Sequence, residues 1–455
     1  MSLFKNRNFS ILLSGQLIST LGNNLYGIAL PWYVYTLTNS KSALAFVGLS
    51  QTLPAVVGLF SGVLVDRWRK RTTMVNSDLI RAAFCFILLL GVVTHFPLWV
   101  ILAFVLALEV VGQFFSPASN ALFPLLVKNE DLAGAQGIMQ SSSATAKLIG
   151  TISGGALMAT LGAPLLFLLD GVSFVLSSVS LLFIRVSEPV KRKDGTGHND
   201  GAAHNGSVAH NDGGSRNDGA AHNDGGSRDE GAVHGAVQKE GNAFYREWRE
   251  GLQVVTKSKY FLLVMLAALV TNFALAPFEI SMTAWVKGPM HGSAFDLGII
   301  NAGFFVGVIA GGVLLGIVAK RISQRGIIVV GLTSIGVFTA CFGLLYTVWA
   351  ETILCLAIGI AVGSLNGSLG ATFITLIPER LRGRVFGLTG ALGMIAMPVG
   401  MAVFGVLMVH IPLTVLFFLI GAICILSGSS LLLPIPNDSN RLSMIDTVVD
   451  SGQAL

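Results

Sequence analysis

Long apolar runs separated by short polar segments occupy most of the chain. A helix needs about 20 mainly apolar residues to cross the hydrocarbon core of a bilayer. Twelve stretches reach this length, six before and six after a long polar segment. They cover residues 9–37, 43–65, 73–94, 97–120, 133–160, 164–185, 260–285, 295–319, 326–348, 350–376, 384–409 and 411–433. The pattern therefore predicts an all-α membrane protein with twelve transmembrane helices.

The basic residues predict how these helices are oriented, because Lys and Arg accumulate in cytoplasmic loops. If the N-terminus is inside, the outer loops hold only Lys41 and Lys287. The inner segments then hold Lys5, Arg7, Arg67, Arg69, Lys70, Arg71, Lys128, Arg185, Lys320, Arg321, Arg325, Arg380, Arg382, Arg384 and Arg441. We therefore expect a multi-pass protein of the cell membrane with both termini and the central polar segment in the cytoplasm.

A shift of 250 residues aligns the end of the first half with the end of the second. Four glycines of the first half fall on four of the second without a gap. These are Gly137, Gly150, Gly155 and Gly171, which meet Gly387, Gly400, Gly405 and Gly421. The repeat predicts two parallel six-helix bundles, at residues 1–186 and 244–433, followed by a cytoplasmic tail at 434–455. Transporters built from such halves hold their substrate near the membrane midplane, between the halves.

Residues 187–243 form a polar segment in which a unit of twelve residues recurs. Each unit opens with a histidine, namely His198, His210, His222 and His234. Low hydrophobicity and abundant Gly predict a disordered cytoplasmic linker, and weak metal sensing is the alternative. After this segment, apolar residues at helical spacing predict an amphipathic helix on the inner membrane face. They are Phe244, Trp248, Leu252 and Val255.

The composition argues against other classes of protein. The chain is 53% hydrophobic and only 12% charged, with a mean hydropathy of +0.72. Soluble domains carry roughly a quarter charged residues. The net charge of +5 follows from the inner loops, so no nucleic-acid partner is indicated. All four cysteines lie in apolar runs, and we find no metal-spaced cluster, catalytic grouping or phosphate loop outside the central segment. The sequence therefore predicts neither an enzyme nor a metal or cofactor site, and the missing nucleotide-binding domain argues against ATP as the energy source.

The segment between the second and third helices carries the most specific motif. It reads Gly62-Val-Leu-Val-Asp66-Arg67-Trp68-Arg69-Lys70-Arg71 and resembles the loop signature of the major facilitator superfamily, Gly-x-x-x-Asp-Arg-x-Gly-Arg-Arg. Patches at residues 76–81, 115–124 and 382–387 resemble the drug-exporter branch of that superfamily, which includes macrolide efflux pumps and the enterobactin exporter.

The resemblance implies a secondary active transporter that exports a hydrophobic or amphipathic small molecule by alternating access, coupled to protons and acting as a monomer. It also implies that the loop acts as a conformational switch through Gly62, Asp66, Arg67 and Arg71. In the family the acidic residue is thought to cap the start of a helix, where the helix dipole favours a carboxylate. A basic inner loop alone would also satisfy the orientation rule.

This sequence departs from the family pattern at two positions. Arg69 stands at the usual glycine of the loop, and Thr151 stands at the proline of the antiporter signature of the fifth helix. The second departure weakens the implication of proton antiport. The second-half counterpart of the loop, near residues 316–321, lacks the acidic residue, so we expect it to contribute only to orientation.

Charges within membrane spans are costly and usually functional or paired. Asp78 and Arg81 are three residues apart, so we expect a structural pair on one helix face. Glu109 and Lys147 lie near the midplane, and Asp170 and Glu279 lie nearer the outer side. The 250-residue shift places Glu109, Lys147 and Asp170 opposite uncharged residues, so these charges are not required by the shared fold.

We therefore predict that Glu109 is the proton-sensitive group and that Lys147 is its electrostatic partner. The next proton-coupling candidates are Asp170 and Glu279. The alternative is a buried ion pair between Glu109 and Lys147 that only fixes helix packing.

Polar residues within the spans are candidates for lining a substrate cavity. They are Asn24, Gln51, Gln113, Gln140, Asn272, Asn301 and Asn366, together with Asn23. Each could instead bond a neighbouring helix. Two alternatives to drug export also remain: a siderophore, sugar or lysophospholipid transporter, and a channel or sensor. A channel or sensor would not need midplane charges confined to one half.

Overall fold

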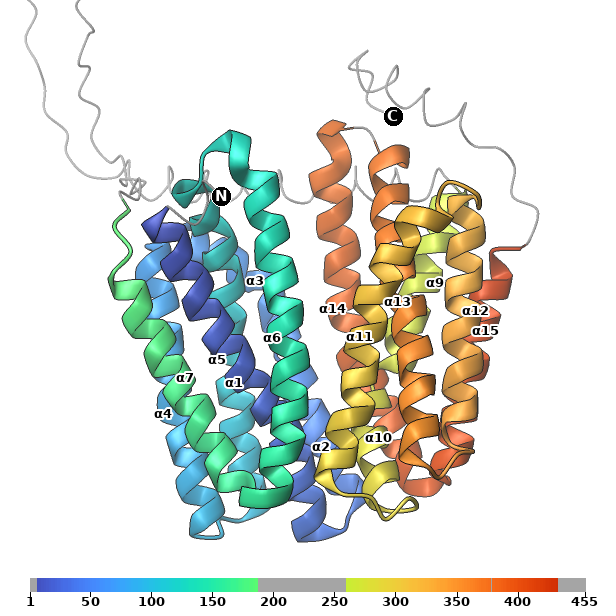
Figure 1. The fold of residues 1–455 in the computed structure, drawn as a ribbon, viewed down its shortest axis with the longest axis horizontal. Helices are drawn as coiled ribbons and strands as arrows, with labels where there is room; N and C mark the ends of the chain where they lie inside the picture. The colour runs from blue at the N-terminus through green and yellow to red at the C-terminus, as the bar shows by residue number, and fades with distance from the viewer. Residues whose placement is uncertain (1–5, 187–258, 378, 433–455) are drawn as a thin grey trace, which may run out of the picture. The chain divides into compact units, whose positions relative to one another are not determined.

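The computed structural model describes residues 6–186, 259–377 and 379–432, and in this part of the chain the regular elements are helices. Figure 1 shows them in chain order. They are α1 (Arg7–Thr38), α2 (Lys41–Thr52), α3 (Ala55–Asp66), α4 (Lys70–Val93), α5 (Leu98–Leu126), the 3-10 helix η2 (Asn129–Asp131), α6 (Leu132–Leu161), α7 (Ala163–Leu182), α9 (Lys259–Leu275), α10 (Phe278–Lys287), α11 (Ala294–Val318), α12 (Gln324–Phe342), α13 (Val348–Leu376), α14 (Glu379–His410) and α15 (Leu413–Ser430). The predicted all-α membrane fold is confirmed. The predicted linker, amphipathic helix and C-terminal tail lie outside the described residues.

Two of the predicted spans consist of two helices each. The span at 43–65 is divided between α2 and α3 before Pro54, and the span at 260–285 is divided between α9 and α10 before Pro277. Proline lacks the backbone N–H that an inner turn of a helix requires, and its ring clashes with the preceding turn. The second break places the start of α10, which carries Glu279, beside a cavity described below.

Ten of the spans are long and apolar enough to cross a membrane by hydropathy alone, and α1 and α6 are not among them. Both helices are long, but their sequences are rich in polar and small residues. The polar residues of α1 include Asn23 and Asn24, which face a cavity described below. The lower hydropathy of α1 therefore reflects its inward position.

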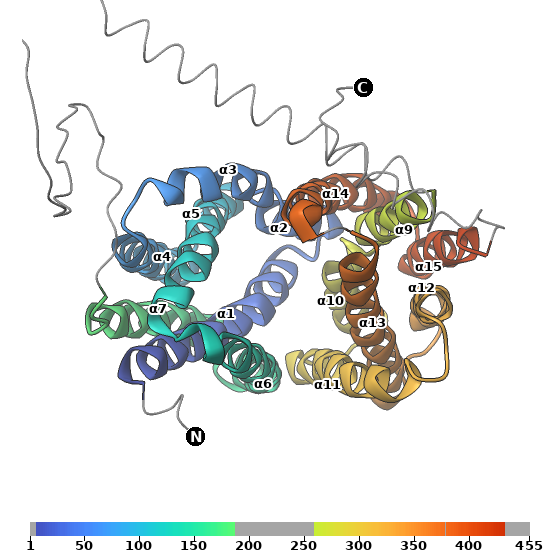
Figure 2. The same ribbon diagram turned by 90° about the horizontal axis from the view of Figure 1, so that it is seen from above.

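The helices of each half pack in equivalent ways. In the first half α4 packs on α5 and α7, and in the second half α12 packs on α13 and α15. Figure 2 shows both groups from above. The Nε atom of Arg71 donates to the carbonyl oxygen of Leu181 at 2.9 Å, and the Nε atom of Arg325 donates to that of Leu431 at 2.8 Å. Each arginine is the second residue of its helix and reaches the C-terminal end of α7 or α15, so the repeat extends to hydrogen bonds.

These bonds correct the expected counterpart of the basic loop. The repeat partner of Arg71 is Arg325, which is 254 residues further on, and it stabilises a helix end as well as adding positive charge. Backbone carbonyls at a helix C-terminus attract a cation because they carry partial negative charge. The offset is 254 at the start of α12 and 250 at the start of α13, because residues 324–347 are four fewer than the equivalent residues 70–97.

The two halves touch through small residues at the ends of helices away from the described N-terminus. A Cβ atom built on Gly155 of α6 would lie 2.8 Å from the Cα atom of Gly298 of α11. A second contact joins α2 to α14, where a Cβ atom on Gly405 would lie 3.0 Å from the side chain of Ala45. Glycine is required at the first of these positions because the two backbones are in direct contact.

Candidate functional site

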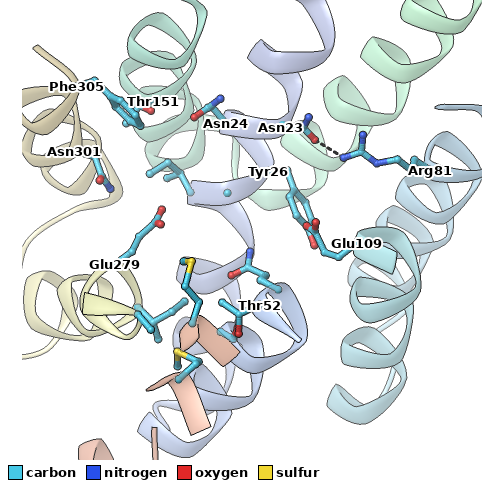
Figure 3. A pocket seen from close by; sticks show the side chains of 18 residues that line it. Asn23, Asn24, Tyr26, Thr52, Arg81, Glu109, Thr151, Glu279, Asn301 and Phe305 are labelled. Atoms are coloured by element: carbon cyan, nitrogen blue, oxygen red, sulfur yellow. Dashed lines mark hydrogen bonds between the residues drawn. The ribbon is translucent and has the colours of Figure 1, made fainter. Parts of the chain in front are cut away.

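A cavity of about 400 Å³ lies between the two halves. Figure 3 shows its side chains. The first half contributes Asn23, Asn24, Tyr26, Gly27, Ile28, Gly48, Gln51, Thr52, Arg81, Glu109 and Thr151, and the second contributes Ala276, Glu279, Ile280, Asn301, Phe305, Met397 and Met401. The lining combines one basic side chain and two carboxyl groups with amides, aromatic rings and thioethers. Such a mixture suits a ligand that is mostly apolar and carries a few polar groups.

Arg81 is the cation of this cavity. Its Nη2 atom donates a hydrogen bond of 2.9 Å to the side-chain oxygen of Asn23, as Figure 3 shows. Its guanidinium carbon lies 3.9 Å from the centre of the Phe174 ring, within the range of a cation–π interaction. These contacts from α1 and α7 hold the guanidinium in place on α4.

Glu109 projects from α5 into the same cavity and is half-buried. Arg81 is the basic residue whose charge acts on this carboxyl group. The charges of both Glu109 and Arg81 act on the nearby Tyr26 hydroxyl. A carboxyl group beside a guanidinium in a poorly hydrated site changes its proton affinity when either the cation or the water moves. A change in the distance between Arg81 and Glu109 would therefore change the affinity of this carboxyl group for a proton.

The predicted partnership of Glu109 with Lys147 is wrong in this structure. Lys147 lies on α6, is exposed, and is not among the residues that line the cavity. Its neighbour Thr151, one turn along the helix, is buried and does line the cavity. An ammonium group outside the cavity avoids the desolvation cost of burial. The basic residue whose charge acts on Glu109 is Arg81 instead.

Glu279 brings a second carboxyl group into the cavity from the other half. It lies in the first turn of α10, directly after the break at Pro277. The partial positive charge of a helix N-terminus favours a carboxylate at this place. Asn301 and Phe305 of α11 line the cavity on the same half, and Figure 3 shows Asn301 near Glu279.

Asp170 and Asp78 are buried in the first half and do not line the cavity. The Oδ2 atom of Asp170 accepts a hydrogen bond from the Cys85 thiol at 3.3 Å. The side chain of Asp170 is fully enclosed, so water does not reach its carboxyl group in this structure. Among the described residues no salt bridge joins Asp78 to Arg81, because the guanidinium reaches away toward Asn23.

The structure brings some of the predicted polar candidates into the cavity. Asn24, Gln51 and Asn301 line it. Gln140 lines a smaller polar cavity of about 290 Å³ within the first half. The remaining candidates are Gln113, Asn272 and Asn366, which are not among the residues that line the central cavity. Gln113 and Asn272 donate to backbone carbonyls one turn earlier in their own helices, at 3.4 Å and 3.0 Å.

The residues of the predicted switch loop surround the connection between α3 and α4. Asp66 is the last residue of α3, and α4 begins after Arg69, whose side chain makes no capping bond. The expectation that Asp66 caps a helix start is therefore not met by α4. The Nζ atom of Lys70 donates to the carbonyl oxygen of Asp66 at 2.8 Å and so stabilises the end of α3. Gly62 faces open space, and Arg67 is exposed at the C-cap of α3.

The sequence pattern does not predict a buried carboxyl group in the first turn of α13. Glu351 is fully buried, and its Oε1 atom accepts a hydrogen bond of 3.0 Å from the indole nitrogen of Trp285. Its position in the first turn of α13 resembles that of an ordinary interfacial acid. Its place as the fourth residue of the helix gives no signal that Trp285 of α10 covers it.

Comparison with known proteins agrees with this architecture. The family model of the Major Facilitator Superfamily matches residues 12–288 and 264–443. Macrolide efflux protein A of Streptococcus pyogenes is 24% identical over 96% of this chain and 97% of its own length. The multidrug efflux pump Tap of Mycolicibacterium fortuitum is 22% identical over 87% of this chain and 88% of its own length. The resemblance to drug exporters of the superfamily is confirmed.

Solved structures share the fold at lower identity. A bacterial homologue of the iron transporter ferroportin in an inward-facing state has a TM-score of 0.65 and 16% identity, over 95% of this chain and 99% of that one. A bacterial homologue of the human lysosomal transporter Spinster, also inward-facing, has a TM-score of 0.60 and 14% identity, over 94% and 95%. These similarities establish the transporter fold alone.

Proposed function

Because the chain belongs to the Major Facilitator Superfamily, we propose that it exports a hydrophobic or amphipathic small molecule across the cell membrane by alternating access, coupled to protons. The observation that carries this proposal is the cavity between the halves, with Glu109 from one half and Glu279 from the other. A site shared by both halves is exposed to either side in turn when the halves rock.

The lining supports an amphipathic substrate. Tyr26, Phe305 and the thioethers of Met397 and Met401 offer apolar and polarisable surface. Thioether side chains adapt to ligands of different shape because they have several rotatable bonds. The amides of the lining supply a few directional hydrogen bonds. The names of the macrolide and multidrug efflux relatives agree with this class of substrate.

Glu109 is the proton-coupling group in this proposal, and Arg81 is its electrostatic partner. In the described conformation Arg81 is held by Asn23 on α1 and faces the cavity. Movement of α1 against α4 changes the distance between the guanidinium and Glu109, and therefore the affinity of Glu109 for a proton. Glu279 is the second candidate, since it faces the same cavity with no basic residue of its own half in the lining.

The orientation rule places both termini in the cytoplasm. The contacts of α6 with α11 and of α2 with α14 then lie on the outer side. In this proposal they form the closed outer gate of an inward-facing state. Outward opening requires both contacts to separate.

The test is transport by the purified protein in liposomes with an imposed pH gradient, using a macrolide and a fluorescent amphipathic dye. We expect Glu109→Gln to lose accumulation driven by the pH gradient while it keeps exchange down the substrate gradient. The matched control is Lys147→Met, which should retain coupled export because Lys147 is exposed outside the cavity.

Full pH-driven export by Glu109→Gln would rule out this residue as the coupling group, and Glu279→Gln would then be tested in the same assay. Transport of a sugar, siderophore or lysophospholipid, with no response to the macrolide or the dye, would overturn the substrate class.

A further inference from the structure

Each half carries a groove on its exposed surface, and the two grooves lie at equivalent places in the repeat. In the second half a groove of about 370 Å³ lies among α11, α12 and α13, and in the first a groove of about 560 Å³ lies along α4 and α5. The 254-residue offset of Arg71 and Arg325 applies to the residues of α4 and of the connection before it. It places Trp68, Thr72, Thr73, Asn76, Ser77 and Ile80 on Ile322, Gly326, Ile327, Val330, Gly331 and Ser334. With the 250-residue offset, Val111 and Phe114 of α5 fall on Ala361 and Ser364 of α13. The two grooves are therefore repeat-related features.

Both grooves are open to the surroundings of the protein. Val330 is 59% exposed in the second-half groove, and Ile80 is 45% exposed in the first-half groove. In a membrane protein such apolar surface faces lipid chains. Small residues form much of the second-half floor, among them Gly331 and Ala361. The groove is therefore deep because the side chains that could fill it are absent.

The length of the second-half groove matches one leaflet of a bilayer. Its lining on α12 extends from Gly326 to Phe338. At 1.5 Å per residue this is roughly 18 Å, a little more than half of the hydrocarbon thickness of about 30 Å. An acyl chain that enters beside the turn before α12 would therefore end near the midplane.

The turn at the mouth of this groove is positively charged. Lys320 and Arg321 are exposed next to the lining residues Val318 and Ile322. Residues 297–350, which cover α11 after its first three residues, the turn and α12, contain three basic residues and no acidic residue. The third is Arg325, whose side chain donates to the backbone carbonyl of Leu431 at the end of α15. Lys320 and Arg321 therefore provide positive charge at the headgroup level that no acid of this segment neutralises.

The first-half groove has a similar mouth. Arg69 lines it directly, together with the hydroxyl side chains of Thr72 and Thr73. Trp68 is 48% exposed, and its ring lies 5.8 Å from that of Phe114. Exposed tryptophan is typical of the level of the lipid headgroups. Residues 66–71 contain four basic residues and one acidic residue, Asp66.

We propose that each groove binds one anionic phospholipid, with an acyl chain along α4 or α12 and the phosphate group at the basic turn. Basic clusters at the membrane surface attract anionic headgroups, and each basic residue contributes roughly a fivefold change in affinity. The apolar groove orients the chain, and the turn selects the headgroup. This assignment does not depend on the transported substrate.

The test is native mass spectrometry of the delipidated full chain, titrated with phosphatidylglycerol and, separately, with phosphatidylcholine. We expect two phosphatidylglycerol molecules to bind and phosphatidylcholine to bind more weakly. The double variant Lys320→Gln/Arg321→Gln should weaken one site by roughly 25-fold, and Arg69→Gln should weaken the other by roughly fivefold. The control Lys41→Gln/Lys128→Gln removes the same charge away from both grooves and should leave binding unchanged.

A second variant separates the groove from the charge. Ser334→Leu places an apolar side chain in the second-half groove and keeps every basic residue, so it should abolish one binding event without changing headgroup preference. Size-exclusion chromatography confirms that each variant is folded. Unchanged phosphatidylglycerol binding in the groove and turn variants, an equal loss in the control, or equal affinity for phosphatidylcholine would overturn the proposal. A dimer that forms in place of lipid binding would also overturn it, because a second copy would then occupy the groove.

Discussion

The guanidinium of Arg81 donates a 2.9 Å hydrogen bond to the side-chain oxygen of Asn23 and thereby joins α4 to α1 at the wall of the central cavity. The bond matters because the first half holds several buried or half-buried carboxyl groups around this guanidinium. The charge of Arg81 acts on the carboxyl groups of Glu109, Asp78 and Asp170. A single cation thus limits the electrostatic cost of the acidic residues in this half.

The first prediction is that Arg81→Gln destabilises the protein by about 3 kcal/mol, because removing one partner leaves buried opposite charges uncompensated. Denaturant-induced unfolding in mixed micelles measures the change. The matched control Lys147→Met should change stability by less than about 0.5 kcal/mol, since substitutions at exposed sites are usually small in effect. The double variant Arg81→Gln/Glu109→Gln should recover part of the loss, and an additive loss would show that the two charges do not interact.

The second prediction concerns the buried contact between Trp285 and Glu351. The indole nitrogen and the carboxyl oxygen are 3.0 Å apart, and both side chains are almost completely buried. Glu351→Ala leaves the indole N–H unsatisfied and should cost about 1–3 kcal/mol beyond the lost packing. Glu351→Gln keeps an acceptor oxygen and should cost less. A double-mutant cycle with Trp285→Phe measures the coupling, and a coupling energy near zero would contradict the hydrogen bond.

The sequence predicts the fold well because the bilayer imposes strong requirements on it. Apolar length predicts the spans, and parallel glycines predict the repeat. The helix breaks at Pro54 and Pro277 lie inside long apolar runs, so they leave the hydropathy signal unchanged. Counting residues from a helix end gives the depth of a side chain but not the direction in which it points. The predicted partnership of Glu109 with Lys147 fails for this reason, because Glu109 lines the cavity while Lys147 is exposed on α6.

Arg81 illustrates a second limit of prediction from the sequence. Its spacing from Asp78 indicates a pair on one helix face, but the side chain is long enough to reach α1. The observed partner Asn23 is 58 residues away, and Phe174 lies on yet another helix. Contacts of this kind depend on tertiary packing, which a single sequence does not specify.

The third prediction concerns the two arginines that reach the ends of α7 and α15. Arg71→Gln and Arg325→Gln should each destabilise their own half by about 1–2 kcal/mol, because each removes a cation and charged hydrogen bonds from a helix C-terminus. Hydrogen exchange measured by mass spectrometry should show faster exchange in the last turn of α7 for the first variant and of α15 for the second. Faster exchange in both helices from either variant would contradict the local role. Arg185→Gln is the control, since the hydrogen bonds between Arg185 and Asn8 use the backbone of Arg185 and the side chain of Asn8.

The last prediction concerns Lys287, which joins the two halves at the ends of helices away from the described N-terminus. Its ammonium group donates to the hydroxyl of Thr36 and lies 4.7 Å from the centre of the Trp32 ring. Lys287 belongs to α10, the helix whose first turn carries Glu279 into the cavity, while Thr36 and Trp32 belong to α1. The contact therefore connects the cavity helix of one half to the central helix of the other.

Lys287→Met should favour separation of the halves at this end. A cation–π contact at a partly exposed site contributes about 0.5–1 kcal/mol, so its loss together with the hydrogen bond should shift the equilibrium by roughly fivefold. Spin labels at Leu161→Cys of α6 and Phe295→Cys of α11 report the separation, because both positions are exposed and belong to different halves. Cys341→Ala provides the background, since Cys85, Cys355 and Cys424 are buried. Lys41→Met, which removes a basic residue from the first turn of α2, is the control and should leave the distance distribution unchanged. If Lys287→Met leaves the distribution unchanged as well, this contact does not hold the two halves together, and the close contact of Gly155 with Gly298 becomes the element to test by Gly155→Val.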